Sequence, residues 1–193
     1  MRVHPLFVRI THWTNAVAMV VMIASGWHIY NASPLFPFTF PSWLTLGGWL
    51  GGALAWHFAA MWLLAVNFMI YLGCGLVSGH IRRRLFPLHP REIWHDAMLA
   101  FRFRLPHDGT RYNAVQRLLY VLVGCGIVLA IVSGLAIWKP VQLYPLTWLF
   151  GGYEFARRVH FLAMTGIVAF IVVHLTLVAL VPRTLRPMVT GRV

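Results

Sequence analysis

Four histidines of this sequence lie inside long apolar runs, where a titratable side chain is costly and usually functional. They are His12, His57, His160 and His174. His160 and His174 are 14 residues apart, which is close to four helical turns, so both imidazoles point to the same side of a helix. At 1.5 Å rise per residue they stand roughly 21 Å apart, within a bilayer core of roughly 30 Å. The spacing indicates two metal or haem sites at different depths of a membrane.

The composition is that of a membrane protein. Of the 193 residues, 60% are hydrophobic and only 10% are charged, whereas about a quarter of the residues of a soluble domain are charged. The formal net charge is +12, and basic cytoplasmic loops explain it better than a nucleic-acid surface does. We therefore expect one domain over residues 1–193, contact with anionic lipid and no nucleic-acid partner.

Four apolar runs predict an all-α fold, a bundle of four transmembrane helices at about residues 10–30, 54–77, 114–138 and 155–181. Residues 43–52 are expected to form an interfacial start to the second run. In the central loop, the apolar residues of the segment 90–103 recur on one side of a helix. This pattern predicts a short helix on the cytoplasmic membrane surface. The basic tail, residues 182–193, is expected to be loosely held.

The distribution of basic residues predicts the orientation. With four spans, the N-terminus, the central loop and the C-terminus share one side of the membrane. That side carries all of the 16 Lys and Arg residues except Lys139, Arg157 and Arg158. The positive-inside rule makes it the cytoplasmic side.

A weak internal repeat relates the two halves of the chain. Residues 25–30 (Ser-Gly-Trp-His-Ile-Tyr) resemble residues 133–138 (Ser-Gly-Leu-Ala-Ile-Trp), and residues 57–61 resemble residues 160–164. The repeat gives His57 and His160 matching depths near the outer face.

Depth sorts the four histidines into two pairs. His57 and His160 lie toward the outer face, and His12 and His174 lie toward the cytoplasmic face. Axial ligation of a haem iron by two histidines needs one neutral imidazole on each side of the porphyrin, which facing helices of a bundle supply. Each pair is therefore predicted to hold one haem.

Haem propionates need cationic or polar partners. Arg9 lies one turn before His12, and Arg157 and Arg158 lie just before His160. These three arginines are the candidate propionate contacts. Interfacial snorkelling is the alternative role for Arg157 and Arg158.

Other roles remain open for the same residue types. Each histidine could instead hydrogen-bond a neighbouring helix. A zinc site would need three or four ligands at one depth, whereas the spans offer pairs of histidines and no carboxylate. Cys74 and Cys125 each lie in a Gly-Cys-Gly tripeptide, and we interpret them as small residues that allow close helix approach.

The order of these residues resembles that of the di-haem b-type cytochrome subunits of nickel–iron hydrogenases, formate dehydrogenase and thiosulfate reductase. The matching features are Arg9-x-x-His12-Trp13, His57, and His160 followed by His174. The resemblance implies two b-type haems in a bacterial inner membrane, the outer one on His57 and His160 and the inner one on His12 and His174. It also implies a quinone site beside the inner haem.

Residues 112–116, Tyr-Asn-Ala-Val-Gln, resemble the Tyr-Asn-x-x-Gln stretch that precedes the third helix in the formate dehydrogenase and thiosulfate reductase branches. On that resemblance Asn113 and Gln116 are candidates for the quinone site. Helix capping is the alternative role for Asn113.

The chain contains no iron–sulfur, molybdenum or nickel motif, so we expect an electron-transfer subunit rather than a complete enzyme. It would relay electrons between a membrane quinone pool and a soluble redox subunit on the outer, periplasmic face, either a molybdenum enzyme or a hydrogenase. One alternative is a stand-alone di-haem oxidoreductase that passes electrons from a small oxidant such as superoxide to quinone. The other is a non-redox anchor or metal transporter.

Overall fold

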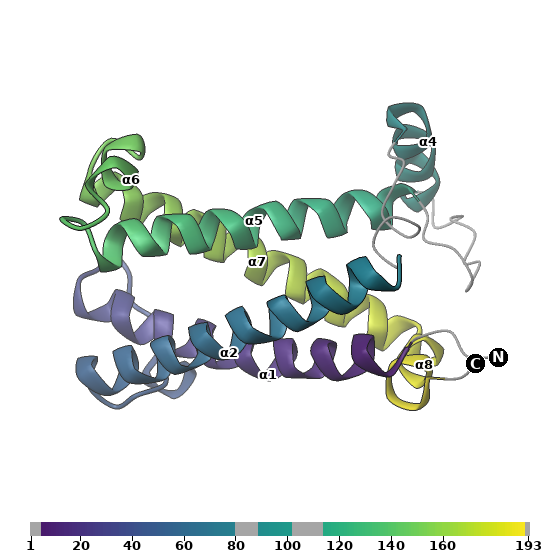
Figure 1. Ribbon diagram of the computed structural model, residues 1–193, viewed down its shortest axis with the longest axis horizontal. Coiled ribbons are helices and arrows are strands. Elements are labelled where there is room, and N and C mark those ends of the chain that lie inside the picture. The colour runs from purple at the N-terminus through teal and green to yellow at the C-terminus, as the bar shows by residue number, and fades with distance from the viewer. Residues whose placement is uncertain (1–4, 80–88, 102–113, 192–193) are drawn as a thin grey trace. The chain divides into compact units, whose positions relative to one another are not determined.

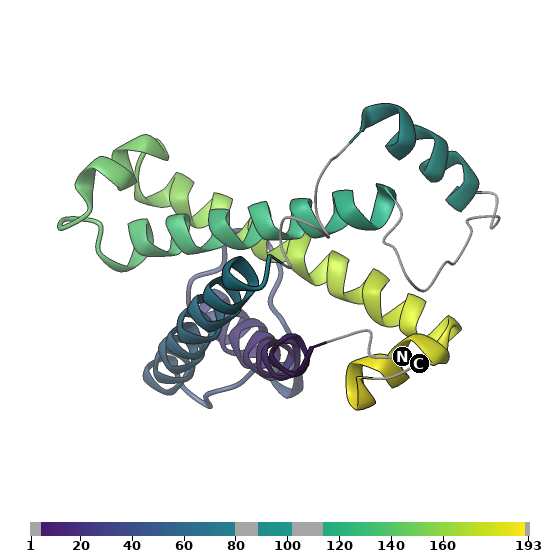
Figure 2. The same ribbon diagram turned by 45° about the vertical axis from the view of Figure 1, so that its right-hand side comes forward.

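The computed structural model describes residues 5–79, 89–101 and 114–191, and every regular element in these ranges is helical. Figures 1 and 2 show the elements from two directions. The long helices are α1 (Leu6–Ala32), α2 (Leu50–Val77), α5 (Ala114–Trp138) and α7 (Tyr153–Leu180). The shorter elements are η1 (Ser42–Leu44), α4 (Pro90–Phe101), α6 (Tyr144–Leu149), η2 (Pro182–Thr184) and α8 (Leu185–Thr190).

Four helices are long and apolar enough to cross a membrane, namely α1, α2, α7 and residues 116–138 of α5. This confirms the predicted all-α fold with four transmembrane helices. The largest differences in helix bounds are at two starts: α1 begins at Leu6 rather than near residue 10, and α2 begins at Leu50 rather than near residue 54. The end of the stretch expected to be interfacial is therefore already helical, and the other bounds differ by at most two residues.

The contacts divide the chain into two compact units. The first unit comprises residues 1–78 and 181–193, and the second comprises residues 79–180. Each unit is built on one antiparallel helix pair, α1 with α2 in the first and α5 with α7 in the second (Figures 1 and 2). The two pairs correspond to the two halves of the internal repeat. That residues 1–193 form one domain stays a prediction.

Small side chains let the helices of each pair approach closely. In the first unit the buried positions recur every seven residues, as Thr11, Ala18 and Ser25 on α1 and as Ala53, Ala60 and Asn67 on α2. In the second unit Ser133 and Ala136 of α5 and Ala156 and Ala163 of α7 are buried. Helices in lipid associate through van der Waals packing of small residues, because lipid is as apolar as leucine. Large apolar side chains are left on the outside, where they suit contact with lipid.

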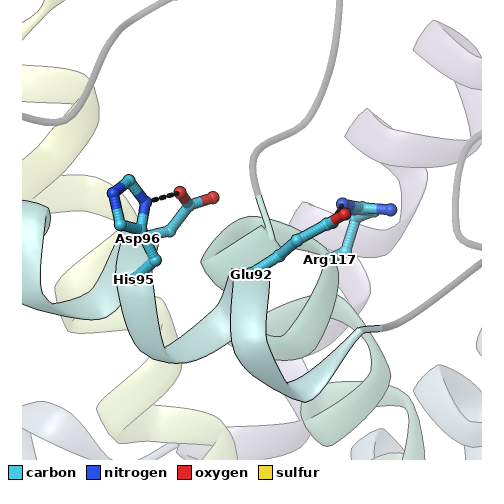
Figure 3. Close-up of polar contacts among 4 residues, drawn as sticks. All are labelled: Glu92, His95, Asp96 and Arg117. Carbon is cyan, nitrogen blue, oxygen red and sulfur yellow. Dashed lines mark hydrogen bonds and ion pairs between the residues drawn. The ribbon is translucent and has the colours of Figure 1, made fainter.

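The predicted helix of the central loop is present as α4, which begins at Pro90. It packs on the start of α5, and Glu92 of α4 accepts a 3.0 Å hydrogen bond from Arg117 of α5 (Figure 3). Residues 102 and 103 lie outside the described ranges. The position of α4 on a membrane surface stays a prediction.

The expectation of a loosely held tail is wrong for residues 182–191. This segment forms η2 and α8, and α1 anchors the end of α8 through two side chains. The Arg9 guanidinium donates to the Val189 carbonyl, and Trp13 Nε1 donates to the Met188 carbonyl at 3.3 Å. A cation at the free carbonyls of a helix C-terminus is favourable, because it complements the helix dipole.

Candidate functional site

His57 lies on α2 with its ring against α1. Its Nδ1 is 3.1 Å from Ser25 Oγ, and Ser25 is completely buried. A Cβ added at Gly26 would lie 3.4 Å from His57 Cε1. The imidazole edge therefore rests on the Ser25-Gly26 dipeptide, and the Nε2 edge is the one directed away from it.

His160 has the same arrangement in the second unit. Its Nδ1 is 3.2 Å from Oγ of the completely buried Ser133 and 2.9 Å from the Ala130 carbonyl oxygen. A Cβ added at Gly134 would lie 3.1 Å from His160 Cε1. The two halves of the sequence repeat therefore share the same local structure. In each half, a Ser-Gly pair on one helix contacts the Nδ1 edge of a histidine on the other helix of the pair.

The other two histidines have aromatic neighbours. The His12 ring on α1 packs edge-on against Trp13, with ring centroids 5.4 Å apart. The His174 ring on α7 stacks on Phe170, with centroids 6.0 Å apart and planes inclined by 9°. Both side chains are half-buried. His12 and His57 belong to the first unit and His160 and His174 to the second, so each predicted ligand pair stays a prediction.

A buried amide that the sequence analysis missed binds α1 at residues on either side of His12 in the sequence. Asn67 of α2 is 4% exposed, and its Nδ2 donates to the Thr11 carbonyl at 2.8 Å and to Asn15 Oδ1 at 2.6 Å. These contacts join α2 to α1 one residue before and three residues after His12. The sequence did indicate this contact through Asn67 itself, because a single polar side chain in an apolar span is unfavourable unless it has hydrogen-bond partners.

The candidate propionate contacts differ in their surroundings. Arg9 binds the Val189 carbonyl, while its Nε is buried without a hydrogen-bond partner among the described residues. Arg157 forms a 3.1 Å ion pair with Glu154, one turn away, and its guanidinium is 6.0 Å from the centre of the Tyr153 ring. Arg158 is exposed.

The candidate quinone residues are only partly described. Gln116 is exposed in the first turn of α5, and Asn113 lies outside the described residues. Figure 3 shows the polar groups next to that end of α5, the Glu92–Arg117 pair and the contact of His95 with Asp96 at 3.5 Å.

A zinc site would need at least three donor side chains close together. Within the ranges that the structure describes, no three His, Cys, Asp or Glu side chains come together to hold a metal ion.

The relatives of the chain agree with a membrane cytochrome. The family described as prokaryotic cytochrome b561 matches residues 3–191. A putative protein-methionine-sulfoxide reductase subunit, YedZ1, from Azospira oryzae is 53% identical over 98% of this chain and 96% of its own length. Probable Ni/Fe-hydrogenase B-type cytochrome subunits of Azotobacter chroococcum and Cupriavidus necator are 27% and 26% identical, over 89% and 86% of this chain and 77% and 74% of their own lengths. No solved structure matches the chain significantly.

The family match extends over nearly the whole sequence and includes all four helices that are able to span a membrane. A b-type haem and membrane electron transfer are what this family implies. The chain belongs to the prokaryotic cytochrome b561 family of multi-pass bacterial membrane proteins.

Proposed function

We propose that this chain relays electrons across the bacterial inner membrane by way of two b-type haems, between a quinone pool and an oxidoreductase subunit on the outer face. The observation that carries the proposal is the equivalent placement of His57 and His160, each held at Nδ1 by a buried serine of its own helix pair. A structural histidine that only bridges two helices does not need the same serine and glycine partners in both halves of a repeat.

The donor groups fit a haem. With Nδ1 engaged by a serine, Nε2 is the ring nitrogen that would bind the haem iron. Gly26 and Gly134 leave room for the imidazole edges. The buried Nε of Arg9 is a cationic donor that suits a propionate.

In this proposal His57 and His160 hold the outer haem, and His12 and His174 hold the inner one. When it is bound, the haem iron supplies the one-electron chemistry. Arg9 would bind a propionate of the inner haem, and Arg158 would bind one of the outer haem. Arg157 would serve in the same way only by sharing its guanidinium with Glu154.

The inner end of α5 is the proposed quinone site. Asn113 and Gln116 would hydrogen-bond the quinone head group there, on the cytoplasmic side that also carries both termini. The basic residues of the central loop and tail support this orientation, because positive charge is enriched on the cytoplasmic side.

The proposed partner is a reductase subunit, which would receive electrons from the quinone pool through this chain. It is favoured by the relative that is 53% identical and that carries the name of a protein-methionine-sulfoxide reductase subunit. A hydrogenase partner, delivering electrons to the quinone pool, is the second candidate and is favoured by the more distant relatives with hydrogenase names.

The alternative function, a stand-alone oxidoreductase that reacts with superoxide, has less support than a relay to a partner subunit. It would need a positively charged outer cavity, and of the three outer cations Arg157 is neutralised by Glu154, while the Lys139 ammonium lies 5.0 Å from the centre of the Trp138 ring.

The reduced-minus-oxidised spectrum of the purified full chain, combined with haem quantitation, tests the proposal. We expect a b-type signal with two haems per chain, oxidised by the partner reductase and reduced by a quinol analogue. A chain without a b-type signal, or with one haem, would contradict it. Activity of the isolated chain with superoxide and quinone would favour the stand-alone alternative.

A further inference from the structure

Ser25 and Ser133 are the two largest completely buried side chains among the described residues, and they occupy equivalent positions of the internal repeat. A hydroxyl buried in an apolar helix interface is unfavourable unless its hydrogen-bonding groups are satisfied. Their partners therefore indicate what these serines do.

The serine hydroxyl hydrogens are already committed to the serines' own helices. Ser25 Oγ lies 2.6 Å from the Val21 carbonyl oxygen, and Ser133 Oγ lies 2.6 Å from the Leu129 carbonyl oxygen. A carbonyl can only accept, so each hydroxyl donates to the preceding turn and presents a lone pair outward.

The histidines must consequently donate. Nδ1–H of His57 points to Ser25 Oγ, and Nδ1–H of His160 points to Ser133 Oγ. The Ala130 carbonyl, 2.9 Å from His160 Nδ1, independently requires a proton on that nitrogen. In both neutral imidazoles Nε2 is therefore the unprotonated nitrogen, the one that can bind iron.

We propose that Ser25 and Ser133 are positioning residues that fix the Nδ1–H tautomer of His57 and His160 and lower the midpoint potential of the haem that these histidines hold. The inference rests on the proposed function, in which both histidines bind the same haem. An acceptor at Nδ1–H makes Nε2 a stronger electron donor, and a stronger donor favours ferric over ferrous iron.

The redox behaviour of serine variants distinguishes a role in fixing the histidine tautomers from a role in helix packing alone. Ser25 and Ser133 lie in different helix pairs, yet their histidines are proposed ligands of one haem. Removing either hydroxyl should therefore shift the same component of a redox titration, and removing both should shift it further.

The experiment is a potentiometric titration of the full chain in membranes, with EPR spectra of the ferric haems, for Ser25→Ala, Ser133→Ala and the double variant. We expect the potential of one haem to rise in each single variant and to rise more in the double variant, with a changed EPR signal of that haem. The other haem should keep its potential.

Thr165→Ala is the matched control. Thr165 is on the same helix as His160, and its Oγ1 donates to the Phe161 carbonyl at 2.9 Å in the same way, but its side chain is exposed. This variant should leave both potentials unchanged.

Unchanged potentials in Ser25→Ala and Ser133→Ala, with both haems bound, would overturn the inference. If an alanine variant loses haem, the corresponding Ser→Thr variant tests the inference instead, because threonine keeps the hydroxyl group. Thr11 shows that a threonine of this chain can donate to the carbonyl of the preceding turn, as the two serines do. Haem binding and potential restored by threonine would support the inference, and haem loss in the threonine variant would overturn it.

Other results of the same experiment would contradict the proposed function. Shifts of two different haems would support the tautomer assignment but contradict the pairing of His57 with His160. A wild-type chain without b-type haem would overturn both.

Discussion

Asn67 on α2 donates a 2.6 Å hydrogen bond to Asn15 on α1, and the same amide donates to the Thr11 carbonyl. These two contacts join the helices immediately around His12. The seven-residue spacing of Ala53, Ala60 and Asn67 keeps this amide on the face of α2 that contacts α1. The amide therefore fixes the contact between α1 and α2 at the level of a proposed inner haem ligand.

Replacing Asn67 by leucine should destabilise the first helix pair. Hydrogen bonds between membrane helices contribute about 0.6 kcal/mol on average and at most about 1.7 kcal/mol, so the loss of two predicts about 1–3 kcal/mol. Unfolding of the purified protein in detergent measures this, and the inner haem should be released before the outer one. Val66→Leu, at an exposed neighbouring position, is the control. Equal stability of the Asn67 variant and the control would contradict this role.

Substitution of the glycines beside the histidines should have graded effects on haem retention. A Cβ at Gly134 would lie 3.1 Å from His160 Cε1, closer than an ordinary contact, whereas a Cβ at Gly26 would lie at an ordinary 3.4 Å from His57. Gly134→Ala should therefore displace its imidazole and weaken haem binding more than Gly26→Ala does.

Gly124→Ala is the control on the same helix as Gly134, because nothing lies within 4 Å of a Cβ added there. This variant should retain both haems, and the helix should gain up to about 1 kcal/mol from the alanine. Haem content per chain, measured after detergent washing, tests the order. Equal retention in Gly134→Ala and Gly124→Ala would show that the close contact is unimportant.

Arg9→Gln should loosen the C-terminal segment. It removes the cation that binds the Val189 carbonyl at the end of α8, so trypsin should cleave the segment faster after Arg183, which precedes Thr184. Lys139→Gln, in the loop between α5 and α6 of the second unit, is the control with the same change of charge. Unaltered cleavage in Arg9→Gln would mean that Trp13 alone holds α8.

The sequence predicts the long helices well, because in a membrane their length and apolarity are imposed by the bilayer. The structure gives α5 the predicted bounds, Ala114–Trp138, and α4 begins at the predicted Pro90. The short helices α6 and α8 were not predicted, because each has only six residues and depends on local contacts. For α8 the contacts come from Arg9 and Trp13, which are remote in sequence.

The candidate site was predictable only in part. The repeat identified the Ser-Gly dipeptides, but their role depends on which face of α1 meets α2, and that face is set by the small residues of both helices. The Glu154–Arg157 ion pair has the i, i+3 spacing of neighbours on a helix, yet only the structure shows that this ion pair forms. Its competition with a haem propionate for Arg157 stays a prediction. The pairing of histidines from the two helix pairs stays a prediction.

Haem analysis of four single variants tests that pairing most directly. His57→Ala and His160→Ala should each remove the same one of two b-type haems, and His12→Ala and His174→Ala should each remove the other. His28→Ala is the control, because His28 contacts Thr45 Oγ1 at 3.2 Å and is no proposed ligand; it should retain both. Loss of different haems in His57→Ala and His160→Ala would contradict the account, as would a wild-type chain that binds no b-type haem.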